Sequence, residues 1–202
     1  MKLLMRIFAF SVLSTLLACG PRFQQLELPP QRSYHSGFSL LPPDEKGWNV
    51  ISRDGNALNL ARHGSSPNET YAISTDVWAL PPLASKTDFV DSVRAKERQS
   101  EVSASPSRFK LRKHDVAPYP KKGDYCALSH VICEDRAAKV KNSGGLHLLI
   151  LEIVSLTCRH PSNANVAISV SYSHRHYPYQ GDPSVSEKAE KLFESVEFTE
   201  LR

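Results

Sequence analysis

Two long segments joined by a turn-like cluster constrain the fold more than any other feature of the chain. Segments 125–140 and 146–158 are rich in β-forming residues, and the cluster Lys-Asn-Ser-Gly-Gly between them is typical of a turn. The pattern predicts one long antiparallel hairpin. With the turn centred near residue 142, opposed positions sum to about 284, which places Cys126 opposite Cys158 and pairs the apolar Leu128 with Leu156.

The amino terminus has the pattern of a processed leader. Lys2 and Arg6 precede the apolar stretch 7–17, which is followed by Ala-Cys19. The stretch has about half of the ~20 residues that a membrane-spanning helix needs, so a transmembrane anchor is disfavoured. A secretory peptide cut at a nearby small residue remains an alternative. The arrangement resembles a bacterial lipoprotein signal, which implies removal of residues 1–18 and lipidation of Cys19.

The lipoprotein resemblance also implies a cellular location. The Cys19 sulfur would carry a thioether-linked lipid and the new amino terminus an acyl chain such as palmitate. Gly20 follows in place of the aspartate that marks inner-membrane retention, which implies the outer membrane, facing the periplasm. Leu17 departs from the family pattern, in which a smaller residue is usual.

Three cysteines remain in the mature chain, in a compartment that is expected to be oxidising. The hairpin register predicts a disulfide between Cys126 and Cys158. Cys133 lies seven residues from Cys126 and therefore points to the other sheet face. Its apolar neighbours indicate a packed, inert thiol, and a reactive thiol is the alternative.

The mature chain divides into a tether and one domain. Residues 19–36 contain three prolines and little apolar periodicity, which indicates a flexible tether. Residues 37–202 form the predicted domain. Helices are predicted from 87 to 100, capped by Ser85 or Thr87, and after residue 184, where Ser184 and Glu187 have the spacing of a capping box. Besides the hairpin, strands are predicted at 38–41, 48–52, 57–62, 71–80, 109–116 and 166–176.

This set of elements predicts an α+β domain, in which two main helices pack on a central antiparallel sheet. The order of elements between residues 37 and 198 resembles the PsbP-like fold: a small hairpin, a strand, a helix, a long meander and a carboxy-terminal helix that ends in Leu-Phe-Glu-Ser-Val-Glu-Phe. The resemblance is one of pattern and includes no catalytic motif. It implies an α+β sandwich and a non-enzymatic accessory or assembly role.

Charge and motifs argue against several classes of function. Removing residues 1–18 leaves 23 basic against 21 acidic residues, so the mature domain is nearly neutral, which argues against nucleic acid as a partner. The basic stretch 108–113 is interpreted as a solvated strand face, with an anionic-ligand patch as the alternative. The chain has no nucleophile elbow, His-Glu-x-x-His motif, phosphate-binding loop or Cys-x-x-Cys motif, and no catalytic residue is assigned.

His174 and His176 form the one pattern that suggests metal chemistry. Positions two apart in a strand project onto one face, so these imidazoles could ligate zinc or copper. A site would need a further ligand, for which His160, His130 and Glu152 are candidates; the last two are expected to be diagonal neighbours on the face of the disulfide. The alternative is a buried polar pair, and no cofactor is predicted otherwise.

Three functional hypotheses follow. The first is a lipid-anchored, non-enzymatic module that binds an envelope protein partner, with its binding residues unknown. The second is a metal-binding protein that uses His174 and His176. The third is a hydrolase with dispersed catalytic residues, which would require a deep polar pocket.

Overall fold

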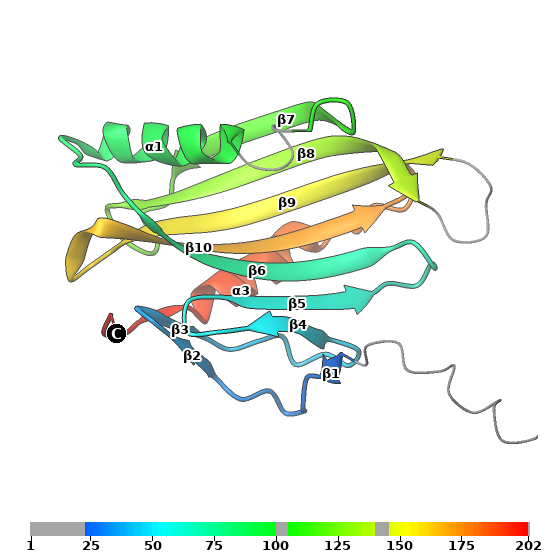
Figure 1. Cartoon of the computed structure of the whole chain (residues 1–202), viewed down its shortest axis with the longest axis horizontal. Coiled ribbons are helices and arrows are strands. Elements are labelled where there is room, and N and C mark those ends of the chain that lie inside the picture. Colours follow the sequence, from blue (N-terminus) through cyan, green and yellow to red (C-terminus); the bar gives the residue numbers. More distant parts are fainter. Residues whose placement is uncertain (1–22, 100–104, 140–145, 202) are drawn as a thin grey trace, which may run out of the picture.

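A computed structural model describes residues 23–99, 105–139 and 146–201. Its main element is an eight-stranded antiparallel sheet with the order β1-β4-β5-β6-β10-β9-β8-β7 (Figure 1). The strands are β1 (Gln24–Gln25), β4 (Asn49–Arg53), β5 (Leu58–His63), β6 (Thr70–Ala79), β7 (Phe109–Pro118), β8 (Cys126–Lys139), β9 (Leu146–His160) and β10 (Asn163–His176).

A second, smaller sheet and two helices complete the described structure. The small sheet has the order β11-β3-β2, with β2 (Ser33–His35), β3 (Phe38–Leu40) and β11 (Glu197–Phe198). The helices are α1 (Lys86–Arg98) and α3 (Val185–Glu194). Figure 1 shows α1 beside β7 near one edge of the large sheet, α3 behind the sheet, and the small sheet towards the opposite edge.

The predicted α+β class is wrong, because the fold is dominated by strands. Strands account for 49% of the structure and helices for 14%, and α1 and α3 have only 13 and 10 residues. The physical reason lies in the length of the strands. The four strands from β7 to β10 have 10 to 15 residues each, well above the usual five or six, so the two short helices cover only part of each sheet face.

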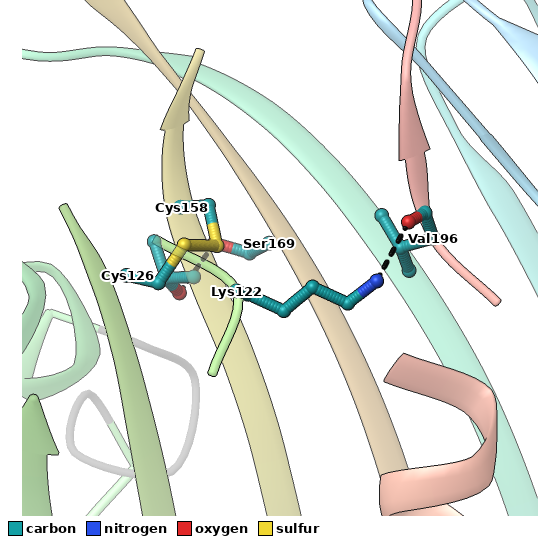
Figure 2. Close-up of a disulfide and its surroundings, with 6 residues drawn as sticks. Lys122, Cys126, Cys158, Ser169 and Val196 are labelled. Atoms are coloured by element: carbon teal, nitrogen blue, oxygen red, sulfur yellow. Dashed lines mark hydrogen bonds between the residues drawn. A yellow bond between two sulfur atoms is a disulfide. The ribbon is translucent and has the colours of Figure 1, made fainter. Parts of the chain in front are cut away.

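The long hairpin has the register that the sequence predicts. Cys126 lies opposite Cys158 and Leu128 opposite Leu156 in the β8–β9 pair, although a bulge interrupts the register farther along, after Asp135. A disulfide joins Cys126 and Cys158 (Figure 2). The predicted turn at 141–145 lies outside the described residues.

The main core lies between the sheet and α3. Alternate residues of β10, among them Ile168, Val170 and Tyr172, pack there against Leu192 and Phe193 of α3. The disulfide belongs to the same cluster and is almost completely buried.

Lys122, in the turn before β8, holds the end of α3 in place. Its Nζ donates hydrogen bonds to the carbonyl oxygens of Glu194 and Val196, at 3.0 and 2.9 Å, and the second of these is visible beside the disulfide in Figure 2. Carbonyls at a helix end lack partners within the helix and carry partial negative charge, so a cation there stabilises the end.

Helix α1 packs on the opposite face of the sheet. Ala127 follows Cys126 in β8 and therefore faces the other way, towards Phe89 and Val93 of α1. Ala127 and Ala167 are small, which lets the helix approach the sheet closely, and both are fully buried. Helix α1 contacts β7 and β8, so it covers one end of the sheet and leaves the neighbouring part of the face less covered.

The two helix starts differ in how far they follow the prediction. Ser85 caps α1 and forms a full capping box with Asp88. Ser184 precedes α3, but its side chain makes no capping hydrogen bond. Its hydroxyl donates instead to Asp182, at 2.6 Å, and the predicted box with Glu187 is therefore not formed.

Part of the segment predicted to be a tether belongs to the folded domain. Strand β1 pairs with β4, and Ser33 and His35 of β2 are buried. The His35 imidazole bonds to the Ser33 hydroxyl at 2.9 Å and to the Asp54 carbonyl oxygen at 2.9 Å. Polar residues that pair with each other produce no apolar periodicity, so periodicity did not indicate that this segment belongs to the folded domain. The leader and Cys19 lie outside the described residues.

Candidate functional site

A groove of about 370 Å³ lies between α1 and the neighbouring face of the large sheet. Its floor comes from β6, β10, β9, β8 and β7, and its wall from the second half of α1. The groove exists because the apolar residues that seat α1 lie at one end of the sheet, where Ala127 and Ala167 allow close contact. Beyond that end the sheet face under the helix consists mainly of hydroxyl residues of β9 and β10, with Val131 and Ile153 beside them, and the space is not filled.

Hydroxyl groups form the floor of this groove. Ser155 of β9 bonds to Ser171 of β10 at 2.8 Å, and Thr157 bonds to Ser169 at 2.9 Å. The indole Nε1 of Trp78 donates to the Ser169 hydroxyl at 2.9 Å. Each strand therefore presents apolar residues to the α3 core and hydroxyl residues to the groove. Paired hydroxyls retain further donor and acceptor capacity, which suits them to bind a polar ligand.

Charged side chains from α1 form the wall. The Lys96 ammonium lies 3.2 Å from the Asp76 carboxylate and 5.4 Å from the centre of the Trp78 ring, a cation–π contact. Farther along the wall, Glu97 bonds to His114 at 2.8 Å and also accepts from the Ser129 hydroxyl. These contacts fix the height of the helix above the floor.

The remaining end of the groove is apolar. Val131 and Ile153 line the floor there, and Leu111 of β7 lines the rim with 47% of its surface exposed. An exposed leucine beside a polar floor gives the groove both an apolar contact and directional hydrogen bonds. This combination is typical of sites that bind a ligand or a segment of a partner protein.

The order of polar groups beside the groove, in Ser129, Glu97 and His114, differs from that of a catalytic triad. In a triad, the histidine contacts the nucleophilic hydroxyl and a carboxylate orients the histidine. Here the carboxylate of Glu97 lies between Ser129 and His114 and bonds to both. Ser129 is also almost completely buried. The arrangement therefore favours a structural or binding role for these three residues over acyl transfer.

The structure places His174 and His176 on the α3 side of β10, far from the groove floor. Their rings stack with centroids 4.5 Å apart, and His174 also stacks on Tyr71 at 4.3 Å. The Nε2 atom of His174 bonds to Glu69 at 2.9 Å, and Nδ1 of His176 bonds to the Tyr177 carbonyl oxygen at 2.6 Å. Each ring therefore has one nitrogen atom engaged in a hydrogen bond within the protein.

Of the three further ligand candidates, Glu152 lies opposite His174 in the β9–β10 register, but its carboxylate bonds to His130. His130 and Glu152 are diagonal neighbours, as expected, and bond to each other at 2.7 Å. Nε2 of His160 bonds to the carbonyl oxygens of Gly37 and Thr199, which ties β9 to the small sheet. Within residues 23–99, 105–139 and 146–201, no group of three or more His, Cys, Asp or Glu side chains is arranged to hold a metal ion.

Glu69 is the centre of the buried cluster around His174. Its carboxylate accepts hydrogen bonds from the backbone and hydroxyl of Ser65, from the backbone of Ser66 and from the hydroxyl of Tyr71. A Cβ atom at Gly64 would lie 2.2 Å from Cδ of Glu69, so the loop can fold over the carboxylate only with glycine at that position.

The ionisation of this cluster reflects burial and hydrogen bonding. Burial alone would raise the pKa of Glu69, but the hydrogen bonds from His174, Ser65 and Ser66 outweigh it and lower the pKa to about 2. Burial lowers the pKa of His174 and outweighs the opposing effect of Glu69. The cluster therefore contains a carboxylate and a neutral imidazole near neutral pH.

We expect Glu69→Gln to destabilise the protein and to weaken its sensitivity to acid. The unfolding free energy at neutral pH should fall by about 1–3 kcal/mol, because buried donors lose a charged acceptor. The folded-state pKa of Glu69 lies below the ordinary 4.5, so its stabilisation is present above pH 4.5 and is lost as the pH falls towards about 2. Denaturant unfolding across this pH range measures both effects.

Glu187→Gln is the matched control for this prediction. Glu187 is exposed on α3 and pairs only with Lys191 among the contacts described for it, so its loss should change the unfolding free energy little. Parallel curves of stability against pH for the wild type and Glu69→Gln would contradict the assigned role of Glu69.

Cys133 is a buried thiol. Its side chain is fully buried, and burial raises the pKa of the thiol to about 11. Almost no thiolate is then present at neutral pH, so the residue is a poor nucleophile. Of the two interpretations drawn from the sequence, the structure agrees with the packed, inert thiol.

The basic stretch 108–113 is largely paired within the protein. Arg108 bonds to Asp135 through two nitrogen atoms, each at 3.0 Å, and Arg112 bonds to Glu134. Lys113 lies 3.1 Å from Asp115. These ion pairs fit a solvated strand face that is stabilised by its neighbours in β7 and β8.

The groove residues were not identified from the sequence. The usable signal was the alternation of hydroxyl residues at 155 and 157 and at 169, 171 and 173. That alternation shows a polar face, but it does not show that a helix lies across it.

Comparison with known proteins adds no family to these observations. Neither the protein-family models nor the curated proteins that were searched give a match to this chain. Across the described residues, neither helix has the length and apolar character needed to span a membrane.

Proposed function

We propose that this protein is a lipid-anchored periplasmic lipoprotein of the outer membrane that acts as a non-enzymatic binding module for another envelope protein. The leader that ends at Cys19 supports the anchor, and the nearly neutral mature chain supports a protein partner over nucleic acid. The observation that carries the binding role is the groove beside α1, with its hydroxyl floor and exposed Leu111.

The groove suits a segment of a protein partner for two reasons. Hydroxyl side chains on the floor can bond to backbone amide and carbonyl groups, which every polypeptide segment carries. Leu111, Val131 and Ile153 offer an apolar contact at one end of the floor. Trp78 is held rigidly by Ser169 and Lys96, so little side-chain entropy would be lost when a partner binds.

Photocrosslinking in cells tests this role. A photoreactive residue at Leu111 is expected to capture one envelope protein, which mass spectrometry identifies, whereas the same residue at the fully exposed Tyr179 should not. Ser171→Leu fills part of the floor and should abolish the product at Leu111 while the protein level stays unchanged. A product at Leu111 that persists in Ser171→Leu, or equal products at both positions, would contradict a groove-specific partner.

Metal binding at His174 and His176 is the second candidate function. One observation favours it: Nδ1 of His174 is buried and has no hydrogen-bond partner in the described part of the chain. Elemental analysis of protein purified without chelators separates the two candidates. Stoichiometric zinc or copper that is lost in His174→Asn would replace the first proposal, whereas trace metal that is equal in both proteins would exclude metal binding at His174 and His176.

A further inference from the structure

Two exposed apolar residues flank the point where the described chain begins. Phe23 is 52% exposed and Ile51 is 43% exposed. Strand β1 pairs antiparallel with β4 through Gln24 and Val50, and Phe23 and Ile51 are the next residues along the two segments. A bulge interrupts the pairing of β4 with β5 between Val50 and Ser52, so Ile51 lies at an irregular point of the edge. The edge of the large sheet therefore carries two exposed apolar residues, each next to a member of the Gln24–Val50 pair.

The covalent chain holds this pair close to the proposed lipid anchor. Cys19 precedes Phe23 by four residues, which span at most about 14 Å when fully extended. A tether of 18 residues, as the sequence predicts, would let the domain move far from the bilayer. Because β1 belongs to the sheet, the usable tether is much shorter, and Phe23 cannot leave the neighbourhood of the lipid surface.

The groove lies towards the opposite edge of the same sheet. Strand β1 is first in the strand order and β7 is last, with α1 packed on β7 and β8 (Figure 1). Seven strand intervals of about 4.8 Å separate the two edges by roughly 34 Å. The groove floor begins at β6, three strand intervals from β1, and extends to β7 at the opposite edge, so it lies away from an anchor at the β1 edge.

From these three observations we propose that the β1–β4 edge rests on the bilayer, with Phe23 and Ile51 in the lipid interface and the sheet upright, so that the groove is presented away from the membrane. The inference rests on the lipidation proposed above. Aromatic and aliphatic side chains gain stability at the boundary of headgroups and acyl chains. The anchor supplies the affinity, and the apolar pair sets the orientation.

Depth-dependent quenching tests this orientation. The full lipidated chain is placed in vesicles of phosphatidylethanolamine and phosphatidylglycerol that contain a lipid with a nitroxide quencher. A fluorophore is attached to Phe23→Cys, Ile51→Cys, Leu111→Cys or Tyr179→Cys in separate samples. Labelling is selective because Cys133 is buried and Cys126 is bonded to Cys158. Leu111 is a matched control because its exposure, 47%, is close to that of Phe23.

The expected result is quenching several-fold stronger at positions 23 and 51 than at 111 and 179. In a second measurement the fluorophore is attached to Gln25→Cys. One sample keeps Phe23 and Ile51, and the other is a double variant that also carries Phe23→Ser and Ile51→Ser. Quenching at position 25 should fall in the double variant, while intact mass shows the same lipid adduct. Phe23 and Ile51 are both exposed, so their substitution by serine should not disturb folding.

The outcomes separate this inference from the anchor itself. Equal quenching at all four positions in a chain that carries the lipid adduct would overturn the orientation and leave the anchor in place. A mature chain without the adduct would overturn both. Quenching at position 25 that is unchanged in the double variant would show that Phe23 and Ile51 do not set the orientation.

Discussion

Cys19→Ser is expected to lose its lipid and to move from the membrane to the soluble fraction almost completely. A hydroxyl cannot take the place of the thiol in the thioether, so neither the diacylglyceryl group nor the later acyl chain would be added. One acyl chain alone gives only marginal binding, with an association constant of about 10⁴ M⁻¹, and each buried methylene adds about 0.8 kcal/mol. Loss of all chains should therefore have an effect close to all or none.

Intact mass and fractionation measure this effect together. Membranes are washed at high pH before the comparison, which removes proteins held only by surface contacts. Cys133→Ser is the control, since Cys133 lies within the folded domain and should keep both the adduct and the membrane location. Membrane association of Cys19→Ser that survives the wash would contradict the lipid anchor and, with it, the proposed location.

Cys126→Ser is expected to lower the unfolding free energy by about 3 to 4 kcal/mol under oxidising conditions. The disulfide closes a loop with a sequence separation of 32 residues, and its loss lets the unfolded chain explore many more conformations. Thermal and denaturant unfolding measure the change. Cys133→Ser should cost less, about 1 kcal/mol, because it only places a hydroxyl in a buried apolar site.

A reductant separates the disulfide from other effects of the substitution. Reduction of the wild type should bring its stability close to that of Cys126→Ser, and it should leave Cys126→Ser itself almost unchanged. Equal destabilisation by Cys126→Ser and Cys133→Ser, with no response of the wild type to reductant, would mean that the bond contributes nothing to stability.

Sequence reasoning succeeded for contacts between strands that are joined by a short turn. The register of 126 with 158 follows from the position of a single turn, because antiparallel pairing advances one residue on each strand. The diagonal contact between His130 and Glu152 follows from the same register. Helix α1 and its cap at Ser85 were also predictable, since capping depends on residues three apart.

The same reasoning failed where several segments meet. The α+β class was predicted by giving two helices the weight of a full layer, whereas the long strands dominate the fold. The predicted tether contains β1 and β2, whose stability comes from pairing with β4 and β3. His174 was considered as a metal ligand because no local pattern shows that Glu69, 105 residues earlier in the chain, takes its Nε2 atom.

The candidate site, too, was predictable from the sequence only in part. Alternation within β9 and β10 was enough to show that one face is apolar and the other rich in hydroxyls, because successive side chains of a strand point to opposite faces. Whether that polar face stays open, is buried or becomes a groove depends on where α1 lies above it. Its position is set by the close contact of Phe89 and Val93 with Ala127 and Ala167, residues up to 78 positions apart. Local periodicity carries no information about such a contact, so the amino-acid pattern determined the faces of the sheet, and packing between distant segments created the groove.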